Sequence, residues 1–447
     1  MKNNLRKNRI LLRSFFSLII LFSIWNIAEL ISGFHLVGLF ILELFSDFGS
    51  FKRELDVHTL DFLFAVVVTS IFLMMSVLGL LYFYVPGTRV PILWKFFNWS
   101  ERLSFQILLG SFLIAALIFT AINSPIISTH EPNYYKDIIV TKLLPPGSKI
   151  HYVERTIENN SANKLTSIQN LKKNVMHQIQ DESKLFITSF NISGDQLIYL
   201  QGFRKYTEPI SHFKIDGTGL IINEKIFYLG SDDFGRDVFS RLIYSTRMSL
   251  MIGLLSVLVS LLLGGLIGYS AGFYGGVLDT ILMRIVDFFF SVPILFLIVF
   301  LIAMFGNSLF LLILALGLGG WMSIARLARA ETISCKKKEF IESLKLTGQT
   351  NYKILTKHIL PNTISPLIVA LVLQFGNVIM AESALSFLGL GVQPPTPTWG
   401  SIIKSGYDFI SSAWWLTTFG GLAIVISVLS FNLLAEGMIS RLNPTKH

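Results

Sequence analysis

The chain has 447 residues, of which 52% are hydrophobic and only 15% are charged, and its mean hydropathy is +0.61. Such a chain has too few polar side chains to cover the surface of a soluble globule, so the composition predicts a membrane protein. The formal net charge of +9 does not indicate nucleic-acid binding, because the basic residues occur mostly in short blocks beside apolar runs, which is the pattern that orients membrane proteins.

Eight segments are apolar over the roughly 20 residues that a membrane-spanning helix needs. They lie near 14–33, 62–85, 103–126, 248–273, 282–305, 308–325, 363–387 and 414–435. The fifth and sixth share one uncharged stretch that is too long for a single helix, and Gly306-Asn307-Ser308 supplies the turn between them. The basic start would also suit a signal peptide, but the first apolar stretch is long and lacks a small-residue cleavage site, which favours a retained helix.

The charges around these segments predict the orientation of the chain. The residues before the first span are basic, whereas the segment 34–61 contains more acidic than basic residues, so the N-terminus should be cytoplasmic. Alternation then places 86–102, 330–362 and the C-terminus in the cytoplasm and 127–247 outside. The single cysteine, Cys335, falls in a predicted cytoplasmic loop beside three lysines and should be a reduced thiol.

The outer segment 127–247 predicts a small β-containing insertion. Residues 184–190 and 196–201 alternate between apolar and polar side chains as strands do, and Asp216-Gly-Thr-Gly219 suggests a hairpin. The part before residue 184 is polar and loosely patterned, with Pro145-Pro-Gly147 as a turn signal.

A compact charged cluster follows the insertion. Asp232, Asp233, Arg236 and Asp237 lie within six residues, and Gly235 allows a sharp turn among them. Carboxylates at this spacing could hold a metal ion, but mutual ion pairing and capping of the next helix explain the pattern better.

Charged side chains also lie in or beside the predicted spans, where charge is expensive and marks functional candidates. Arg284 and Asp287 are three residues apart on one helical face and can pair with each other. Glu382 follows an uncharged helix, with Gln374 eight residues earlier on a nearby face. Two interpretations of Glu382 remain open: it faces a translocation pathway, or it is a buried structural glutamate hydrogen-bonded to a neighbouring helix.

The segment 339–361 predicts a docking element between two hydrophobic runs. Phe340, Ile341 and Leu344 form the apolar face of a short helix that carries Glu342 and ends at Gly348. A second helical piece follows, contains His358, and should stop at Leu360-Pro361. A helix this short cannot bury its apolar face alone, so that face should need a groove on a partner.

These motifs resemble a known family. Phe340-Ile-Glu-Ser-Leu344, Gly348 and His358-Ile-Leu-Pro-Asn362 look like the "EAA" loop of bacterial ABC importer permeases, in the dipeptide, oligopeptide and nickel branch. Further similarity lies at 229–237, 272–279, 283–287 and 385–400, in the family's order. Ser343 and Leu344 replace the two alanines for which the loop is named, and the N-terminal spans and outer insertion depart from the usual six-span plan.

The resemblance implies an all-α polytopic membrane fold with a six-span permease core, two extra N-terminal spans and the β-containing insertion. The corresponding divisions are an N-terminal extension at 1–102, the first core helix at 103–126, the insertion at 127–247, and the remaining core at 248–447 with a coupling loop at 330–362.

The function implied is that of a transport subunit in the bacterial inner membrane, without catalysis of its own. It would pair with a second permease subunit as a heterodimer, with two ABC ATPase subunits and with an extracytoplasmic binding protein, and would import peptides or a related small solute by alternating access. The ATPase-coupling residues would be Phe340, Ile341, Glu342, Leu344, Gly348, His358 and Pro361.

No cofactor or metal is expected on this chain. Its sequence lacks a G-x-x-x-x-G-K-[ST] phosphate loop, so ATP and Mg²⁺ should bind the partner ATPase. An ATPase-independent secondary transporter or channel is the alternative, since it would also explain the spans but would need no docking loop. A membrane-bound enzyme would need a convergent polar site, for which the 232–237 cluster is the one candidate.

Overall fold

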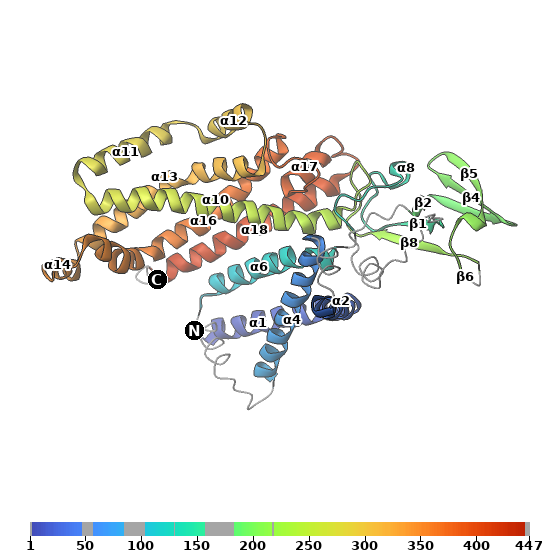
Figure 1. The fold of residues 1–447 in the computed structure, drawn as a ribbon, viewed down its shortest axis with the longest axis horizontal. Coiled ribbons are helices and arrows are strands. Elements are labelled where there is room, and N and C mark those ends of the chain that lie inside the picture. Colours follow the sequence, from blue (N-terminus) through green and yellow to red (C-terminus); the bar gives the residue numbers. More distant parts are fainter. Residues whose placement is uncertain are drawn as a thin grey trace.

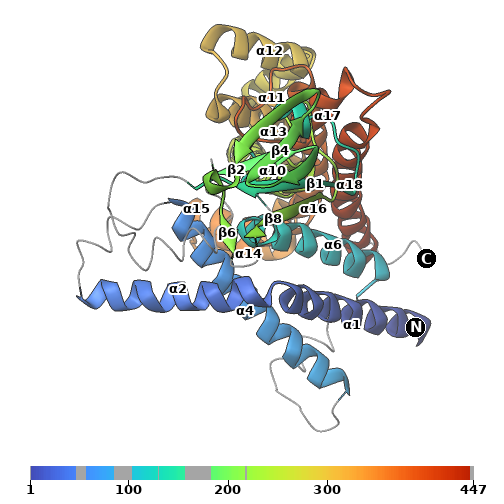
Figure 2. The ribbon, with the colours of Figure 1, turned by 90° about the vertical axis from the view of Figure 1, so that its right-hand side faces the viewer.

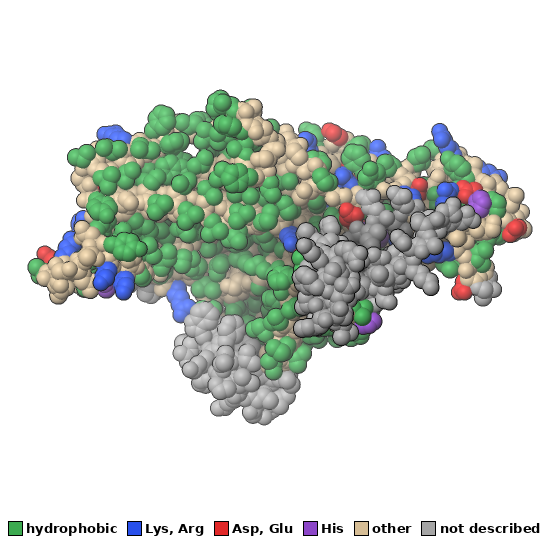
Figure 3. Space-filling view, viewed as in Figure 1, with side chains coloured by type: hydrophobic (Ala, Val, Ile, Leu, Met, Phe, Trp, Pro, Cys, Tyr) green, Lys and Arg blue, Asp and Glu red, His purple; other side chains and the backbone are tan. Residues whose placement is uncertain are grey.

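The structure is a computed structural model that describes residues 2–46, 57–84, 103–128, 130–156, 183–216 and 219–442. Long helices run side by side along the long axis of the molecule, with α14 at one end and the strands gathered at the other (Figure 1). Hydrophobic side chains cover the broad face of the helical part, and charged side chains gather toward its two ends (Figure 3). The predicted polytopic helical fold with a small β insertion is confirmed.

The helical core contains twelve helical segments in the described residues, including a stretch of π-helix named η2. They are α6 (Phe105–Ile122), α7 (Ser124–Ile127), α10 (Val238–Tyr274), α11 (Gly276–Ser291), α12 (Ile294–Phe305), α13 (Leu309–Lys336), α14 (Glu339–Leu346), α15 (Asn351–Lys353), η2 (Ile354–Ile359), α16 (Leu360–Phe387), α17 (Trp399–Tyr407) and α18 (Trp414–Leu442).

Seven of the described helices are long and apolar enough to cross a membrane, and a bent pair brings the number to eight. The pair is α11 and α12, which meet at 84°. The predicted span at 282–305 is therefore bent and not one straight helix: Pro293 has no N–H and its ring disfavours a continuing helix, so the chain turns there. The predicted turn at Gly306-Asn307-Ser308 is confirmed, since the Ser308 hydroxyl accepts a hydrogen bond of 3.2 Å from the Leu311 N–H and begins α13.

Helices α10 and α13 are in direct backbone contact along a stripe of small residues spaced four apart on α10. The hydroxyls of Ser256 and Ser260 donate to the carbonyls of Ile313 and Gly317 at 3.1 and 2.6 Å. Farther along the same stripe, a Cβ at Gly268 would lie 2.3 Å from the carbonyl oxygen of Ala325. Small side chains allow this close approach and so form the centre of the helical core.

The N-terminal extension consists of α1 (Lys2–Trp25), α2 (Ile27–Ser46) and α4 (Val57–Tyr84). The predicted first span at 14–33 has the wrong bounds: the candidate span is Asn8–Trp25, because the helix breaks at Asn26 and α2 lies across the long axis (Figures 1 and 2). The Asn26 amide donates to the carbonyl of Phe22 at 3.0 Å and competes with the backbone, as asparagine does inside helices. Phe22 and Phe72 pack edge-on against Phe119 of α6, which joins the extension to the core.

The insertion contains eight strands in the described residues. They are β1 (Ser148–Glu154), β2 (Lys184–Ile187), β3 (Ser189–Ser193), β4 (Gln196–Gln201), β5 (Arg204–Pro209), β6 (Ile215–Asp216), β7 (Gly219–Leu220) and β8 (Ile222–Phe227), together with α8 (Ile138–Thr141) and a 3-10 turn, η1 (Ile210–His212). All pairs are antiparallel, in the orders β2-β1-β8, β3-β4-β5 and β6-β7.

The predicted strands and the hairpin are confirmed, with Asp216 paired to Gly219. Strand β1 was not predicted, because its buried side chains, Ile150 and Val153, do not alternate regularly with polar ones. The predicted boundary at 247 falls inside α10, which begins at Val238. The carboxylate of Asp237 caps that helix by accepting from the N–H of Ser240 at 2.9 Å.

Candidate functional site

The predicted coupling segment lies at the end of the helical core opposite the insertion (Figure 1). Helix α14 ends in a Schellman motif: the N–H of Gly348 donates to Lys345 at 3.0 Å and that of Gln349 to Leu344 at 3.2 Å. Gly348 has a φ of +77°, which a residue with a branched side chain strongly disfavours. The predicted turn at this glycine is confirmed.

Some apolar residues of α14 and the segment after it are buried against the rest of the chain, and others are exposed. Ile341 is fully buried in a cluster with Phe273, Cys335 and Ile359, and Leu344 packs at its edge. Phe340 is 40% exposed, and Leu346 and Tyr352 are 85% and 76% exposed. The prediction that Ile341 faces a partner is wrong, because α13 and η2 pack beneath α14 and supply its apolar contacts, whereas Leu344 is only partly buried.

The second helical piece does not stop at Pro361, contrary to the prediction. Residues 354–359 form a π-helix that leads directly into α16, so one helical run extends from Asn351 to Phe387. The N–H of Leu360 donates to the carbonyl of Leu355, five residues back, and this wider turn accommodates a proline in the next position. His358 is half-buried, and its carbonyl accepts from the Asn362 amide at 2.7 Å.

A groove of about 620 Å³ lies between α12, α13 and α16. Its walls are mostly apolar, but Ser323, Gln374 and Asn377 contribute polar groups. The Gln374 amide donates to the Ser260 hydroxyl at 2.6 Å, and Asn377 is exposed on the outside of α16. The sequence signal for this groove is two amides, Gln374 and Asn377, which lie three residues apart in an otherwise apolar helix and were not predicted as a pair.

Glu382 does not line this groove. Its side chain is 1% exposed, and its carboxylate accepts hydrogen bonds from Ser386 at 2.7 Å and Ser383 at 3.4 Å. Thr398, which caps α17, donates to the Ser386 hydroxyl at 3.2 Å. Of the two interpretations that the sequence left open, these contacts favour the structural glutamate, which joins α16 to α17.

The predicted pair between Arg284 and Asp287 is wrong. Arg326 of α13 reaches across and donates to Asp287 at 2.7 Å, and both side chains are half exposed. One turn farther along α13, Arg329 holds Asp279 by two hydrogen bonds of 2.5 and 2.6 Å. A guanidinium on the facing helix offers better fork geometry than one three residues away on the same helix, so these pairs fasten α11 to α13.

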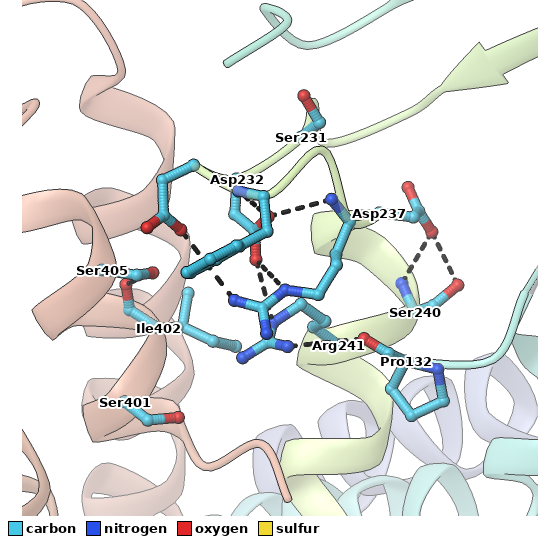
Figure 4. A network of polar contacts seen from close by, with 12 residues as sticks. Pro132, Ser231, Asp232, Asp237, Ser240, Arg241, Ser401, Ile402 and Ser405 are labelled. Carbon is cyan, nitrogen blue, oxygen red and sulfur yellow. Dashed lines mark hydrogen bonds and ion pairs between the residues drawn. The ribbon is translucent and has the colours of Figure 1, made fainter. Parts of the chain in front are cut away.

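The charged cluster at the end of the helical core beside the insertion is an ion-pair network, as predicted (Figure 4). Asp232 is 1% exposed and accepts from the Arg236 backbone N–H and Nε at 2.9 and 2.7 Å. Arg241 was not predicted in this cluster because it lies one turn inside α10; its Nε adds a third contact to Asp232 at 3.4 Å. Gly235 has a φ of +78° and closes the turn.

Asp233 lies beside this network, 3.9 Å from Arg236. Burial and the neighbouring Asp232 charge raise the pKa of its carboxyl, against the lowering effect of Arg236. In the part of the chain that the structure describes, no group of three or more His, Cys, Asp or Glu residues is arranged to hold a metal ion.

Comparisons with known proteins identify a family and several similar proteins. Residues 264–446 match the family described as "Binding-protein-dependent transport system inner membrane component". The chain is 45% identical over 216 residues to the dipeptide transport system permease protein DppC of Escherichia coli K12, covering 48% of this chain and 72% of that protein. The corresponding protein of Alkalihalophilus pseudofirmus is 39% identical over 217 residues, covering 48% of this chain and 71% of that protein.

Among solved structures, an inward-facing form of the MetNI methionine ABC transporter matches 45% of this chain and 95% of that chain, with a TM-score of 0.39 and 19% identity. The family match and these two relatives, which are 39% and 45% identical over more than two thirds of their own length, show the family to which this chain belongs. This chain belongs to the binding-protein-dependent transport system inner membrane components, and it is a multi-pass transport subunit of the bacterial inner membrane.

Proposed function

We propose that this chain is the permease subunit of an ATP-driven peptide importer. The observation that carries the proposal is its identity of 39–45% to relatives named as dipeptide permeases, across 71–72% of their length. A peptide carries several polar groups that cannot cross a bilayer unaided, so the subunit must offer it a polar path between helices.

The exposed residues around Gly348 support docking of an ATPase. Phe340, Leu346 and Tyr352 present apolar surface at a polar end of the molecule, where such a patch usually marks a binding partner. Glu342 and Lys345 are exposed beside them and can fix the orientation of that partner. Since the sequence has no phosphate loop, ATP and Mg²⁺ would bind the ATPase, and α14 would pass its movement to α13 and α16 through the buried Ile341.

The groove between α12, α13 and α16 supports a translocation path. A polar side chain that faces lipid is unfavourable, so the exposed Asn377 should face water or another protein. A second permease subunit laid over the groove would enclose it as a channel, with Gln374 and Ser323 on this chain's wall. Alternating access would then be a movement of the two subunits relative to each other.

The proposal also implies an orientation in the membrane. The ATPase end would be cytoplasmic, together with both termini, and the β insertion would lie outside, where an extracytoplasmic binding protein delivers the peptide. A secondary transporter would leave the apolar surface around Gly348 without a role.

Purification of the tagged chain from its native membrane tests the proposal. We expect two ABC ATPase subunits and one different permease chain to co-purify, and Phe340→Asp to remove the ATPase subunits while leaving the second permease bound. A matched control is Phe203→Asp, which also changes an exposed aromatic residue, but on the insertion. Isolation of this chain without any ATPase, from membranes that still transport the peptide, would contradict the proposal.

A further inference from the structure

A cavity of about 700 Å³ opens at the outer mouth, between the loop 231–236 and the segment from Gly389 to Phe409. It is separate from the groove between α12, α13 and α16, and the two share no lining residue. Its volume lies within the range of pockets that hold small ligands, and a dipeptide would fit inside it. Ser401 and Ser405 of α17 line the other wall, across from the ion-pair network (Figure 4).

Charged groups of both signs line this cavity. Asp233, Arg236 and Arg241 come from the loop and the start of α10, and Lys404 and Asp408 come from α17 and its end. Arg241 is itself 5% exposed, so its guanidinium is shielded from bulk water while it borders the cavity. Electrostatic interactions at such a position are stronger than at the open surface.

Asp232 and Asp233 differ in how many hydrogen bonds their carboxylates accept. Both oxygens of Asp232 accept hydrogen bonds, from the backbone N–H groups of Phe234 and Arg236 and from the Arg236 side chain. The buried Oδ1 of Asp233 accepts no hydrogen bond from any described residue. Burial and the Asp232 charge raise the pKa of this carboxyl, although Arg236 and Arg241 lower it.

Arg241 likewise has donors to spare. Its Nη1 donates to the carbonyl of Pro132 at a long 3.4 Å, and its Nε lies 3.4 Å from Asp232 without hydrogen-bond geometry. A guanidinium has five N–H groups and binds carboxylates in a fork, so Arg241 can bind a further carboxylate from the cavity side.

We propose that this cavity is a receiving site for a zwitterionic peptide, with the ligand's ammonium group bound by Asp233 and its carboxylate by Arg241 and Lys404. The inference rests on the proposed function and adds to it a position for the peptide before it reaches the membrane groove. Arg236 already pairs with Asp232, and Asp237 already caps α10 through Ser240, so neither the ion pair nor the start of the helix needs Asp233.

Equilibrium binding to the complete importer in lipid nanodiscs, without the binding protein, tests this site. Three probes are compared: alanyl-phenylalanine, its N-acetyl derivative and its C-terminal amide. Because a hydrogen bond to a charged group is worth about tenfold or more in affinity, we expect the free dipeptide to bind at least about tenfold more tightly than either blocked form.

Two variants assign each end. Asp233→Asn should lower the affinity for the free dipeptide and for the amide about tenfold. The affinity for the N-acetyl form should not change, because that form has no ammonium group. Arg241→Lys keeps the positive charge but removes the bidentate guanidinium. It should lower the affinity for the free dipeptide and for the N-acetyl form and leave the affinity for the amide unchanged. Lys205→Gln, an exposed change on β5, is the control and should alter none of the three.

Equal affinity of the unsubstituted complex for all three probes, or no binding at millimolar concentration, would overturn the inference even if a variant failed to assemble. So would a variant that weakened all three probes alike. A complex that transports peptide with ATP but shows no such discrimination would refute the receiving site alone, whereas a chain that assembles with no ATPase would refute the proposed function.

Discussion

The amide of Gln374 on α16 donates a hydrogen bond of 2.6 Å to the hydroxyl of Ser260 on α10, and that hydroxyl donates one of 2.6 Å to the carbonyl of Gly317 on α13. This polar chain joins three helices at the wall of the membrane groove. It holds an amide at the edge of an otherwise apolar cavity, where a peptide group could exchange hydrogen bonds with it.

Gly320 provides the room for this amide. A Cβ at Gly320 would lie 1.6 Å from Nε2 of Gln374, so Gly320→Ala should push the amide away from Ser260 and remove a hydrogen bond worth about 1 kcal/mol. We expect peptide uptake to fall severalfold while the ATPase subunits stay bound. Gly265→Ala is the matched control, since the atoms nearest to its Cβ would lie 3.9 Å away. An equal loss of uptake in both variants would contradict the role assigned to Gln374.

Glu382 should behave as a structural residue. Glu382→Gln keeps the shape and can still accept from Ser386, so it should assemble and transport normally. Glu382→Ala leaves the buried hydroxyls of Ser383 and Ser386 without that partner and opens a cavity, which should cost about 2 kcal/mol and lower the yield of assembled complex. Size-exclusion chromatography measures assembly, and peptide uptake measures transport. An assembled Glu382→Gln variant that no longer transports would show that Glu382 acts in the translocation pathway.

The buried Lys225 makes the stability of the insertion depend on pH. Its Nζ lies 4.4 Å from the ring of Phe227, and burial lowers its pKa from 10.5 to about 8. Between those values the unfolded chain binds a proton that the folded insertion has lost, so stability should rise with pH, by on the order of 3 kcal/mol from pH 8 to 10.5. Below pH 8 the amine is protonated in both states and the desolvation penalty is present in full.

Hydrogen exchange of the β1 and β8 amides, corrected for the intrinsic effect of pH, measures this dependence in the intact protein. Lys225→Met should raise the protection of these amides from exchange at pH 7 and abolish the increase in protection above pH 8. Lys205→Met, a change at an exposed residue, should alter neither. A wild-type insertion whose protection stays constant from pH 8 to 10 would contradict the assignment.

The sequence predicted the features that depend on local chemistry. Gly348 ends α14 because only a positive φ closes that turn, and Asp237 begins α10 because its carboxylate caps the helix. Features that depend on a distant partner were wrong or missed. Asp287 binds Arg326 instead of Arg284, Ile341 is covered by this chain's own helices, and Arg241 joins Asp232 only after α10 has formed. Spacing along one helix cannot show which neighbour lies closer in space.

Thiol labelling tests the predicted sidedness. Cys335 is free but only 2% exposed at the end of α13, so it is a poor reporter, and Cys335→Ala should serve as the background. In that background a cysteine at the exposed Ser343 of α14 should react with an impermeant maleimide only after the cell is opened, whereas one at the exposed Thr207 of β5 should react from outside. The opposite pattern would reverse the orientation and the ATPase assignment with it.

The most direct test of the central claim is ATP-dependent uptake of a dipeptide into proteoliposomes that contain the complete complex and the binding protein. Gly348→Val should disfavour the positive-φ turn by about 1–2 kcal/mol and abolish uptake, whereas Gly348→Asn, which tolerates that conformation and meets no atom within 4 Å of its Cβ, should retain most of it. Uptake that needs ATP and follows this order is the predicted result. Uptake that continues without ATP, or that is unchanged in the Val variant, would contradict the account.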